Sequence, residues 1–194
     1  QNDDDHARLN SGTAASIPDP VYGGQLQNFA TPGQTAEATV SVTYEETPVT
    51  LPDGMVVSLR SPVIALTGLG YGPLREDLMI SPRIASPMIG LGMLEALAED
   101  DILSWADPDD RDSDGISGRG NRIKSKLSRE IMLGRFGWKA NQATLKDQVT
   151  DAFSGDLGIS SSLHPANAGD CTPAQTACVA APDGGDAKSG NVEI

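Results

Sequence analysis

Apolar and polar residues alternate over residues 38–46, which is the pattern of a strand with one face toward solvent. A second run of β-forming residues follows at 55–59. The Pro-Asp-Gly sequence at 52–54 lies between the two runs and is typical of a turn. We therefore predict a β-hairpin over about residues 40–59, exposed on one face.

Helical spacing of apolar residues is found in two other segments, at about residues 87–105 and 142–154. The first segment contains Gly90 and Gly92, each of which weakens a helix by about 1 kcal/mol relative to alanine. Glycines retained in a helix indicate that something packs closely against the backbone, either another helix or a flat cofactor. Gly155 is expected to end the second helix.

The rest of the chain has little periodicity. Its 194 residues include 21 Gly and 13 Pro, and only 4% of them are aromatic. This composition predicts short elements, many turns and a modest core. We expect a flexible arm at residues 1–20, a single domain at 21–180 and a tail at 181–194. The predicted fold class is α+β, loop-rich and leaning toward helix.

The net charge of the chain limits the classes of molecule that it can bind. The formal net charge is −13 and the sequence pI is about 4.3. Such an acidic chain is a poor match for nucleic acid or an anionic membrane, because binding phosphate needs a basic face. No run approaches the roughly 20 apolar residues that a transmembrane helix needs. The composition therefore argues against nucleic acid as a partner and against a membrane span.

The strongest local signal is an acidic loop. Carboxylates alternate at Asp110, Asp112 and Asp114, and Gly115 follows directly. In the first half of a calcium loop, alternating carboxylates converge on the cation and the glycine allows a sharp turn. An amide, Asn121, stands where an EF-hand has its bidentate glutamate. We predict a weak calcium site formed by the three aspartates and Asn121; the alternative is a solvated acidic turn.

The two cysteines, Cys171 and Cys178, do not form a CxxC pair, and no histidine follows closely. Two sulfurs alone cannot fill the four positions of a structural zinc site. The intervening residues include Pro173 and can turn back, which favours a local disulfide. A disulfide in turn predicts a periplasmic or extracellular location. The alternative is two free thiols in a reducing compartment.

Seven of the fourteen Lys and Arg residues lie between residues 119 and 139. They either neutralise the acidic loop or form a clamp for an anionic group such as a cofactor carboxylate, for which the guanidinium fork is suited. Trp138 is either a core anchor or a relay for electrons. His164, before a proline in a loop, is either structural or a ligand. The sequence contains no Ser-His-Asp set, P-loop or HExxH motif.

Several segments, taken in order, resemble the bacterial di-haem oxidoreductase family, whose members are often labelled thiol oxidoreductases and are related to di-haem cytochrome c peroxidases. The resemblance covers roughly Pro18 to Gly185. It rests on SPRIASPMIGLGMLEAL, DPDDRDSDGISGRGN, LGRFGWKANQATLKDQVTDAFSGDLGISS and CTPAQTAC, together with PDPVYGGQLQ and the hairpin. The resemblance implies a cytochrome-c-peroxidase-like fold with an inserted β-hairpin, c-type haem, redox chemistry, a periplasmic location and an electron-transfer partner protein.

The chain departs from this family at one point, since it contains no CxxCH haem-attachment motif. It resembles the middle portion of a longer member, in which the haem is attached outside this segment; the alternatives are a haem-less relative and a stable proteolytic piece. We do not expect this chain alone to be catalytic. A hypothesis from another class is a haem-less, secreted, calcium-stabilised structural or binding module.

The resemblance also implies roles for three residues. Glu95 would be the acid/base group near a haem pocket, which a peroxidase needs to move protons during O–O cleavage. Arg135 would contact a haem propionate, and Trp138 would relay electrons. The alternative for Glu95 is an ordinary glutamate on a helix surface.

Overall fold

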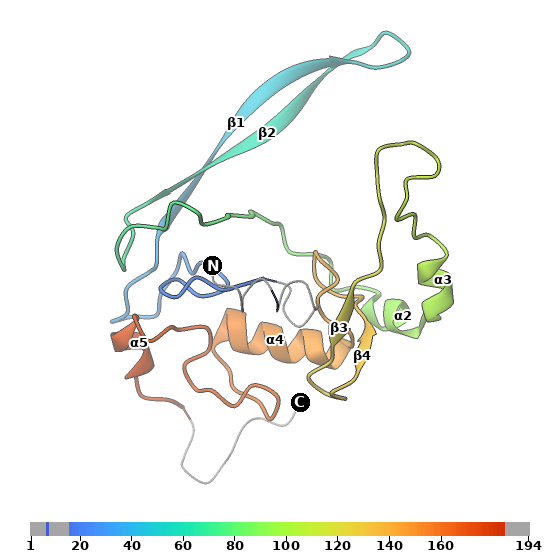
Figure 1. The fold of residues 1–194 in the computed structure, drawn as a ribbon. Coiled ribbons are helices and arrows are strands. Elements are labelled where there is room, and N and C mark those ends of the chain that lie inside the picture. The colour runs from blue at the N-terminus through green and yellow to red at the C-terminus, as the bar shows by residue number, and fades with distance from the viewer. Residues whose placement is uncertain (1–6, 8–15, 185–194) are drawn as a thin grey trace. The chain divides into compact units, whose positions relative to one another are not determined.

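A computed structural model of the chain describes Ala7 and residues 16–184 (Figure 1). Contacts between Cα atoms divide the chain into two compact units, whereas the sequence analysis expected one domain. The first unit consists mainly of Arg83–Cys171, and the second of Asp19–Pro82 with Thr172–Ala180. Most of the arm expected at residues 1–20 and most of the tail expected at 181–194 lie outside the described residues.

The second unit carries the predicted hairpin, formed by β1 (Thr39–Thr50) and β2 (Val56–Thr67). The strands are antiparallel, with Thr39 opposite Thr67 at one end and Thr50 opposite Val56 at the other. At the turn, Asp53 accepts a hydrogen bond from the Met55 amide through its side chain (3.0 Å). The hairpin is confirmed, but β2 continues well past residue 59. Pro62 is tolerated within it because both strands of a two-stranded sheet are edge strands.

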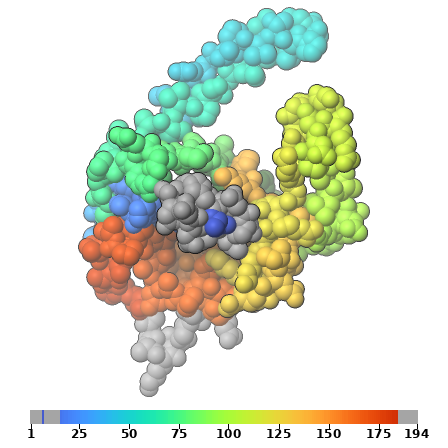
Figure 2. Space-filling model, viewed as in Figure 1, coloured from blue at the N-terminus to red at the C-terminus, as the bar shows by residue number. Residues whose placement is uncertain are grey.

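The hairpin extends away from the rest of its unit as a two-stranded arm (Figures 1 and 2). No residue of either strand is buried, so the prediction of one covered face is wrong. A bare two-stranded hairpin is only marginally stable in water. Local side-chain contacts support this one, since Glu46 pairs with Arg60 and the Arg60 guanidinium lies 4.9 Å from the Tyr44 ring centre.

A small polar core holds the base of the second unit. Tyr22 is buried, donates its hydroxyl to the Gly72 carbonyl (2.5 Å) and meets the edge of the Tyr71 ring. Glu37 is also buried and accepts hydrogen bonds from the Gln27 amide (2.6 Å) and the Gln175 side chain. The short helix α5 (Thr176–Val179) begins directly after Gln175 in the chain.

In the first unit, two short helices replace the single helix predicted at residues 87–105: α2 (Leu91–Ala96) and α3 (Glu99–Leu103). Extended backbone at Leu97 and Ala98 separates them. The first helix begins late because Gly90 has a left-handed backbone (φ 87°).

The glycines expected to bring a packing partner close to α2 have open space above them. A Cβ added at Gly90 or Gly92 would meet no described atom within 4 Å. The interpretation that these glycines permit close packing therefore finds no support among the described residues.

The long helix α4 (Leu145–Leu157) begins and ends about three residues later than predicted. Thr144 is its N-cap, and its side chain accepts a hydrogen bond from the Asp147 amide (3.0 Å). Its C-cap is Gly158, in the left-handed region (φ 66°), rather than Gly155.

A second small hairpin, β3 (Arg122–Lys124) and β4 (Ile131–Leu133), was not predicted. Its strands of three residues are too short to give a period-2 pattern. The hairpin contributes to the apolar core of the first unit, which contains Ile123, Leu133, Phe136 and Ala143. Gly134 follows β4 where the chain passes so close to the Ala140 carbonyl that a Cβ would overlap it.

The described fold is thus a loop-rich α+β mixture, as predicted, with two hairpins where the sequence predicted one. The expected bias toward helix is absent, because only α4 exceeds six residues among the described helices. In the part of the chain that is described, no helix has the length and apolar character needed to cross a membrane.

Candidate functional site

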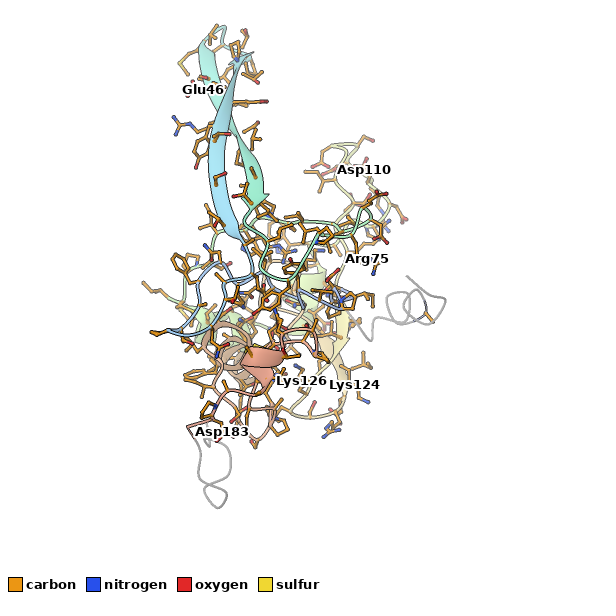
Figure 3. The ribbon with its side chains drawn as sticks, turned by 90° about the vertical axis from the view of Figure 1, so that its left-hand side faces the viewer. Glu46, Arg75, Asp110, Lys124, Lys126 and Asp183 are labelled. Carbon is orange, nitrogen blue, oxygen red and sulfur yellow. The ribbon has the colours of Figure 1, made fainter. Side chains whose placement is uncertain are left out.

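The acidic loop brings its three aspartates together. One carboxylate oxygen from each of Asp110, Asp112 and Asp114 lies within 4.8 Å of the others. Asp110 is half-buried and the other two are exposed. The loop projects from the first unit, with Asp110 near its outer part (Figures 2 and 3). Oxygen ligands at this spacing suit a hard cation such as Ca²⁺.

Local hydrogen bonds hold the loop in this form. The Gly115 amide donates to the Asp110 carboxylate (3.2 Å), and the Ile116 amide donates to Asp114 (2.8 Å). Asp110 and Ser113 have positive φ angles of 50° and 60°. Aspartate tolerates this backbone better than most residues, and serine less well.

The fourth expected ligand, Asn121, is held at another segment through its side-chain nitrogen. Its side-chain amide donates to the carbonyls of Lys139 and Ala140, both at 3.0 Å. Nearer the base of the loop, one Asp107 oxygen accepts from the Arg111 amide (2.8 Å). The other Asp107 oxygen is buried and has no hydrogen-bond partner among the described residues.

Glu95 lies on α2, and its side chain reaches the start of α4. One carboxylate oxygen accepts a hydrogen bond from the Leu145 amide (2.7 Å). A carboxylate at a helix N-terminus satisfies a free amide and interacts favourably with the helix dipole. Glu95 therefore has a structural contact in addition to its predicted role as an acid/base group.

Arg135 contacts the C-terminal end of α2, the same end that carries Glu95. Its Nη1 donates to three carbonyl oxygens, those of Leu94 (3.0 Å), Glu95 (3.4 Å) and Leu97 (2.7 Å). This is favourable because the last carbonyls of a helix lack intrahelical partners and carry partial negative charge. Glu95 and Arg135 thus both hold the C-terminal end of this short helix, Glu95 through its contact with α4 and Arg135 through the free carbonyls.

Trp138 is not a core anchor, because its side chain is 62% exposed. Its indole N–H donates to the Ile84 carbonyl (2.6 Å). Several large apolar residues of the first unit are exposed, and we refer to them together as the apolar face: Ile84, Met88, Ile89, Met93 and Trp138. Ile89 is 96% exposed and Met93 is 79% exposed.

One residue of this set, Met88, also lines a shallow groove. Met88 forms one side, and α4 lines the groove with Val149, Ala152, Phe153 and Leu157, with Asp156 beside them. Exposed apolar surface of this kind marks an interaction site or a ligand groove.

The basic residues after the acidic loop make separate contacts. Arg119 donates to the Pro108 carbonyl (2.7 Å), and Arg122 pairs with Glu99 on α3. Neutralisation within the unit therefore accounts for Arg122, whereas Arg119 binds a backbone carbonyl at the base of the acidic loop.

Cys171 and Cys178 are joined by a disulfide, so the predicted pairing is confirmed and the alternative of free thiols is wrong. Structural disulfides are typical of oxidising compartments.

The sequence analysis missed a buried carboxylate, Asp147. It is 1% exposed and accepts hydrogen bonds from the Ser125 hydroxyl (2.8 Å), the Thr144 hydroxyl (2.9 Å) and the Leu127 amide (3.0 Å). Burial alone would raise the pKa of Asp147, but these hydrogen bonds outweigh it and lower the pKa below its usual value. The Thr-x-x-Asp sequence from Thr144 is a capping-box pattern and was the available signal.

Next to Asp147 lies a cluster formed by His164, Lys126 and Asp151. Lys126 Nζ lies 3.1 Å from His164 Nε2 and 3.2 Å from an Asp151 oxygen. Burial lowers the pKa of His164, and the positive charge of Lys126 lowers it further, against the opposing effect of Asp151 and Asp147. His164 had been considered as a ligand, but the cluster itself was not expected.

Comparison with known proteins identifies the class. Residues 9–193 match the family described as "Di-haem oxidoreductase, putative peroxidase". The chain therefore belongs to the di-haem oxidoreductase family. No curated protein matches the chain, and no solved structure does.

Membership of this family implies haem, but the cysteines of this chain do not suit its covalent attachment. The sequence has no CxxCH motif, and Cys171 and Cys178 are used in the disulfide. Attachment through thioethers would need two thiols close to a histidine ligand. The residues present therefore do not fit the attachment of c-type haem.

Proposed function

We propose that this chain is the part of a longer, peroxidase-like di-haem oxidoreductase that lines a haem attached elsewhere in the same polypeptide. The family match carries this proposal. The apolar face supports it, because a flat apolar group would cover surface that is otherwise exposed to water. The haem would supply the redox chemistry, and the chain would supply its surroundings.

Glu95 is our candidate for the group that holds and moves a proton. Its helix, α2, has no buried residue and contributes Met93 to the apolar face. The carboxylate is anchored at α4 through one oxygen, which gives it a defined position. A positioned acid/base group contributes about 10²- to 10⁴-fold to the rate of a reaction that transfers protons.

Arg135 and Trp138 are our candidates for binding a propionate and relaying electrons. A guanidinium has five N–H donors. The Arg135 contacts with described residues all use Nη1, which leaves donors for a carboxylate. Trp138 lies in the apolar face with an exposed ring, as a relay to a neighbouring redox centre requires.

The proposal includes a periplasmic or extracellular location, an electron-transfer partner protein and a structural calcium ion. The disulfide supports the oxidising compartment. The three converging aspartates support the calcium, with affinity in the weak, extracellular range.

Two substitutions at Glu95 in the complete protein test its role. Glu95→Gln keeps an acceptor oxygen for the Leu145 amide but removes the titrating proton. We expect peroxide turnover to fall by about 10²-fold while the melting temperature stays near that of wild type. Glu95→Ala should reduce both, because the contact with α4 is also lost. If Glu95→Gln turns over peroxide at the wild-type rate, Glu95 is a structural residue only.

The second candidate function is a haem-less, calcium-stabilised structural or binding module. It is favoured by the acidic cluster together with the missing attachment motif. An absorption spectrum of the complete protein separates the two functions. A Soret band with c-type α and β bands supports the oxidoreductase, and a colourless protein supports the module.

A further inference from the structure

His164, Lys126 and Asp151 join three segments of the first unit. Lys126 lies in the β3–β4 turn, Asp151 on α4, and His164 in the loop after α4. Lys126 Nζ contacts both His164 Nε2 (3.1 Å) and an Asp151 oxygen (3.2 Å). The side chain of His164 is only 13% exposed, whereas those of the other two are nearly half exposed.

The contact between Lys126 and His164 fixes the state of the histidine. A lysine ammonium has three donors and no acceptor, so His164 Nε2 must accept the hydrogen bond. Nε2 can accept only when the ring is neutral, with its proton on Nδ1. The observed arrangement therefore belongs to neutral His164.

Asp151 lies where it can pair with either Lys126 or a protonated His164. The same oxygen that accepts from Lys126 lies 3.7 Å from His164 Nε2. Its other oxygen accepts from the Gln142 side chain (2.8 Å), which holds the carboxylate in position. The distance to His164 is too long for a hydrogen bond in the neutral state, but a small shift of the ring would close it.

We propose that Asp151 exchanges Lys126 for His164 when His164 takes up a proton, so that this cluster is an acid-sensitive latch on the β3–β4 turn. Protonation places two positive charges about 3 Å apart and removes the acceptor at Nε2. The imidazolium then donates to Asp151, and Lys126 moves into solvent. The turn loses its side-chain tie to the loop that carries His164.

The other charged group near the His164 ring, Asp147, does not prevent this exchange of partners. Asp147, on α4, favours protonated His164 through its negative charge. Its oxygens accept hydrogen bonds from Ser125, Thr144 and Leu127, so it stays in place while Asp151 changes partner. The base of the turn therefore remains attached when the latch opens.

Titration of the histidine rings by NMR tests this latch in the full chain. The sequence contains two histidines, so two sets of ring signals are assigned. We expect His164 to titrate below the usual pH range of a histidine. Removal of the nearby positive charge in Lys126→Met should raise the His164 midpoint by about one pH unit, and Asp151→Asn should lower it. The Leu127 and Ser128 amides should shift with the same midpoint as His164.

Lys124→Met is the matched control, since it removes the same charge from the end of strand β3 (Figure 3 labels both lysines), and Lys124 is not among the charges that shift the His164 pKa. It should leave the His164 midpoint within about 0.2 pH units of wild type. The latch is overturned if Lys126→Met and Lys124→Met behave alike, or if the turn amides show no transition at the His164 midpoint.

Discussion

Two carboxylate clusters in the first unit differ in how they are built. The acidic loop takes Asp110, Asp112 and Asp114 from five consecutive residues, and it is largely exposed. The cluster around Asp147 and Asp151 draws on segments up to 39 residues apart, from Ser125 to His164, and Asp147 is buried. The first cluster depends on local backbone geometry, whereas the second exists only when the unit is folded. The two should therefore respond differently to mutation, to cations and to acid.

Loss of Asp147 should have the largest effect on stability. Asp147→Ala leaves the buried Ser125 hydroxyl and the part-buried Leu127 amide without their acceptor. We expect the free energy of unfolding to fall by about 3 kcal/mol. Urea titration measures it, with Asp112→Asn in calcium-free buffer as the control that should stay within about 0.5 kcal/mol of wild type. Equal losses in the two variants would contradict the distinction between the clusters.

Calcium should act on the exposed cluster alone. Binding to the folded state stabilises it by mass action, so 10 mM calcium at a Kd of about 1 mM would contribute about 1.4 kcal/mol. The melting temperature should rise with calcium and return to its starting value with EDTA. Asp110→Asn should abolish this response, whereas Asp156→Asn on α4 should retain it. A response that survives in Asp110→Asn would place the cation elsewhere.

Acid should act on the buried cluster. The folded-state pKa of Asp147 lies below its usual value, so its ionised form stabilises the fold above the unfolded-state pKa. That contribution is lost as the pH falls through the folded-state pKa. The pH dependence of unfolding should therefore be shallower in Asp147→Asn than in wild type below about pH 4. Parallel curves for the two proteins would show that Asp147 does not titrate differently on folding.

These clusters also show what the sequence could and could not predict. The aspartates of the loop, the β1–β2 hairpin and the disulfide depend on short spacings, and all three features are present. Whether the loop holds calcium stays a prediction. The capping-box pattern at Thr144 and Asp147 was a readable signal. The other two donors, Ser125 and Leu127, could not be predicted because they lie in the β3–β4 turn, whose flanking strands are too short for a recognisable pattern.

The predicted bounds of the helices were wrong for a related reason. Apolar spacing does not reveal the left-handed backbone at Gly90, which delays the start of α2, or the extended Leu97 and Ala98 that end it. The exposure of Trp138 could not be predicted either, because the sequence alone does not distinguish a buried tryptophan from an exposed one.

The apolar face of the first unit is the centre of the proposed function, and Trp138 reports on it directly. Haem quenches the fluorescence of a nearby indole by energy transfer. The contribution of Trp138 is obtained by subtracting the fluorescence of Trp138→Phe from that of the wild type. This difference is measured once in the complete protein and once in the 194-residue chain. We predict that Trp138 emission is strong in the chain alone and nearly absent in the complete protein. Equal Trp138 emission in both, with haem present, would contradict the claim that this face lines a haem.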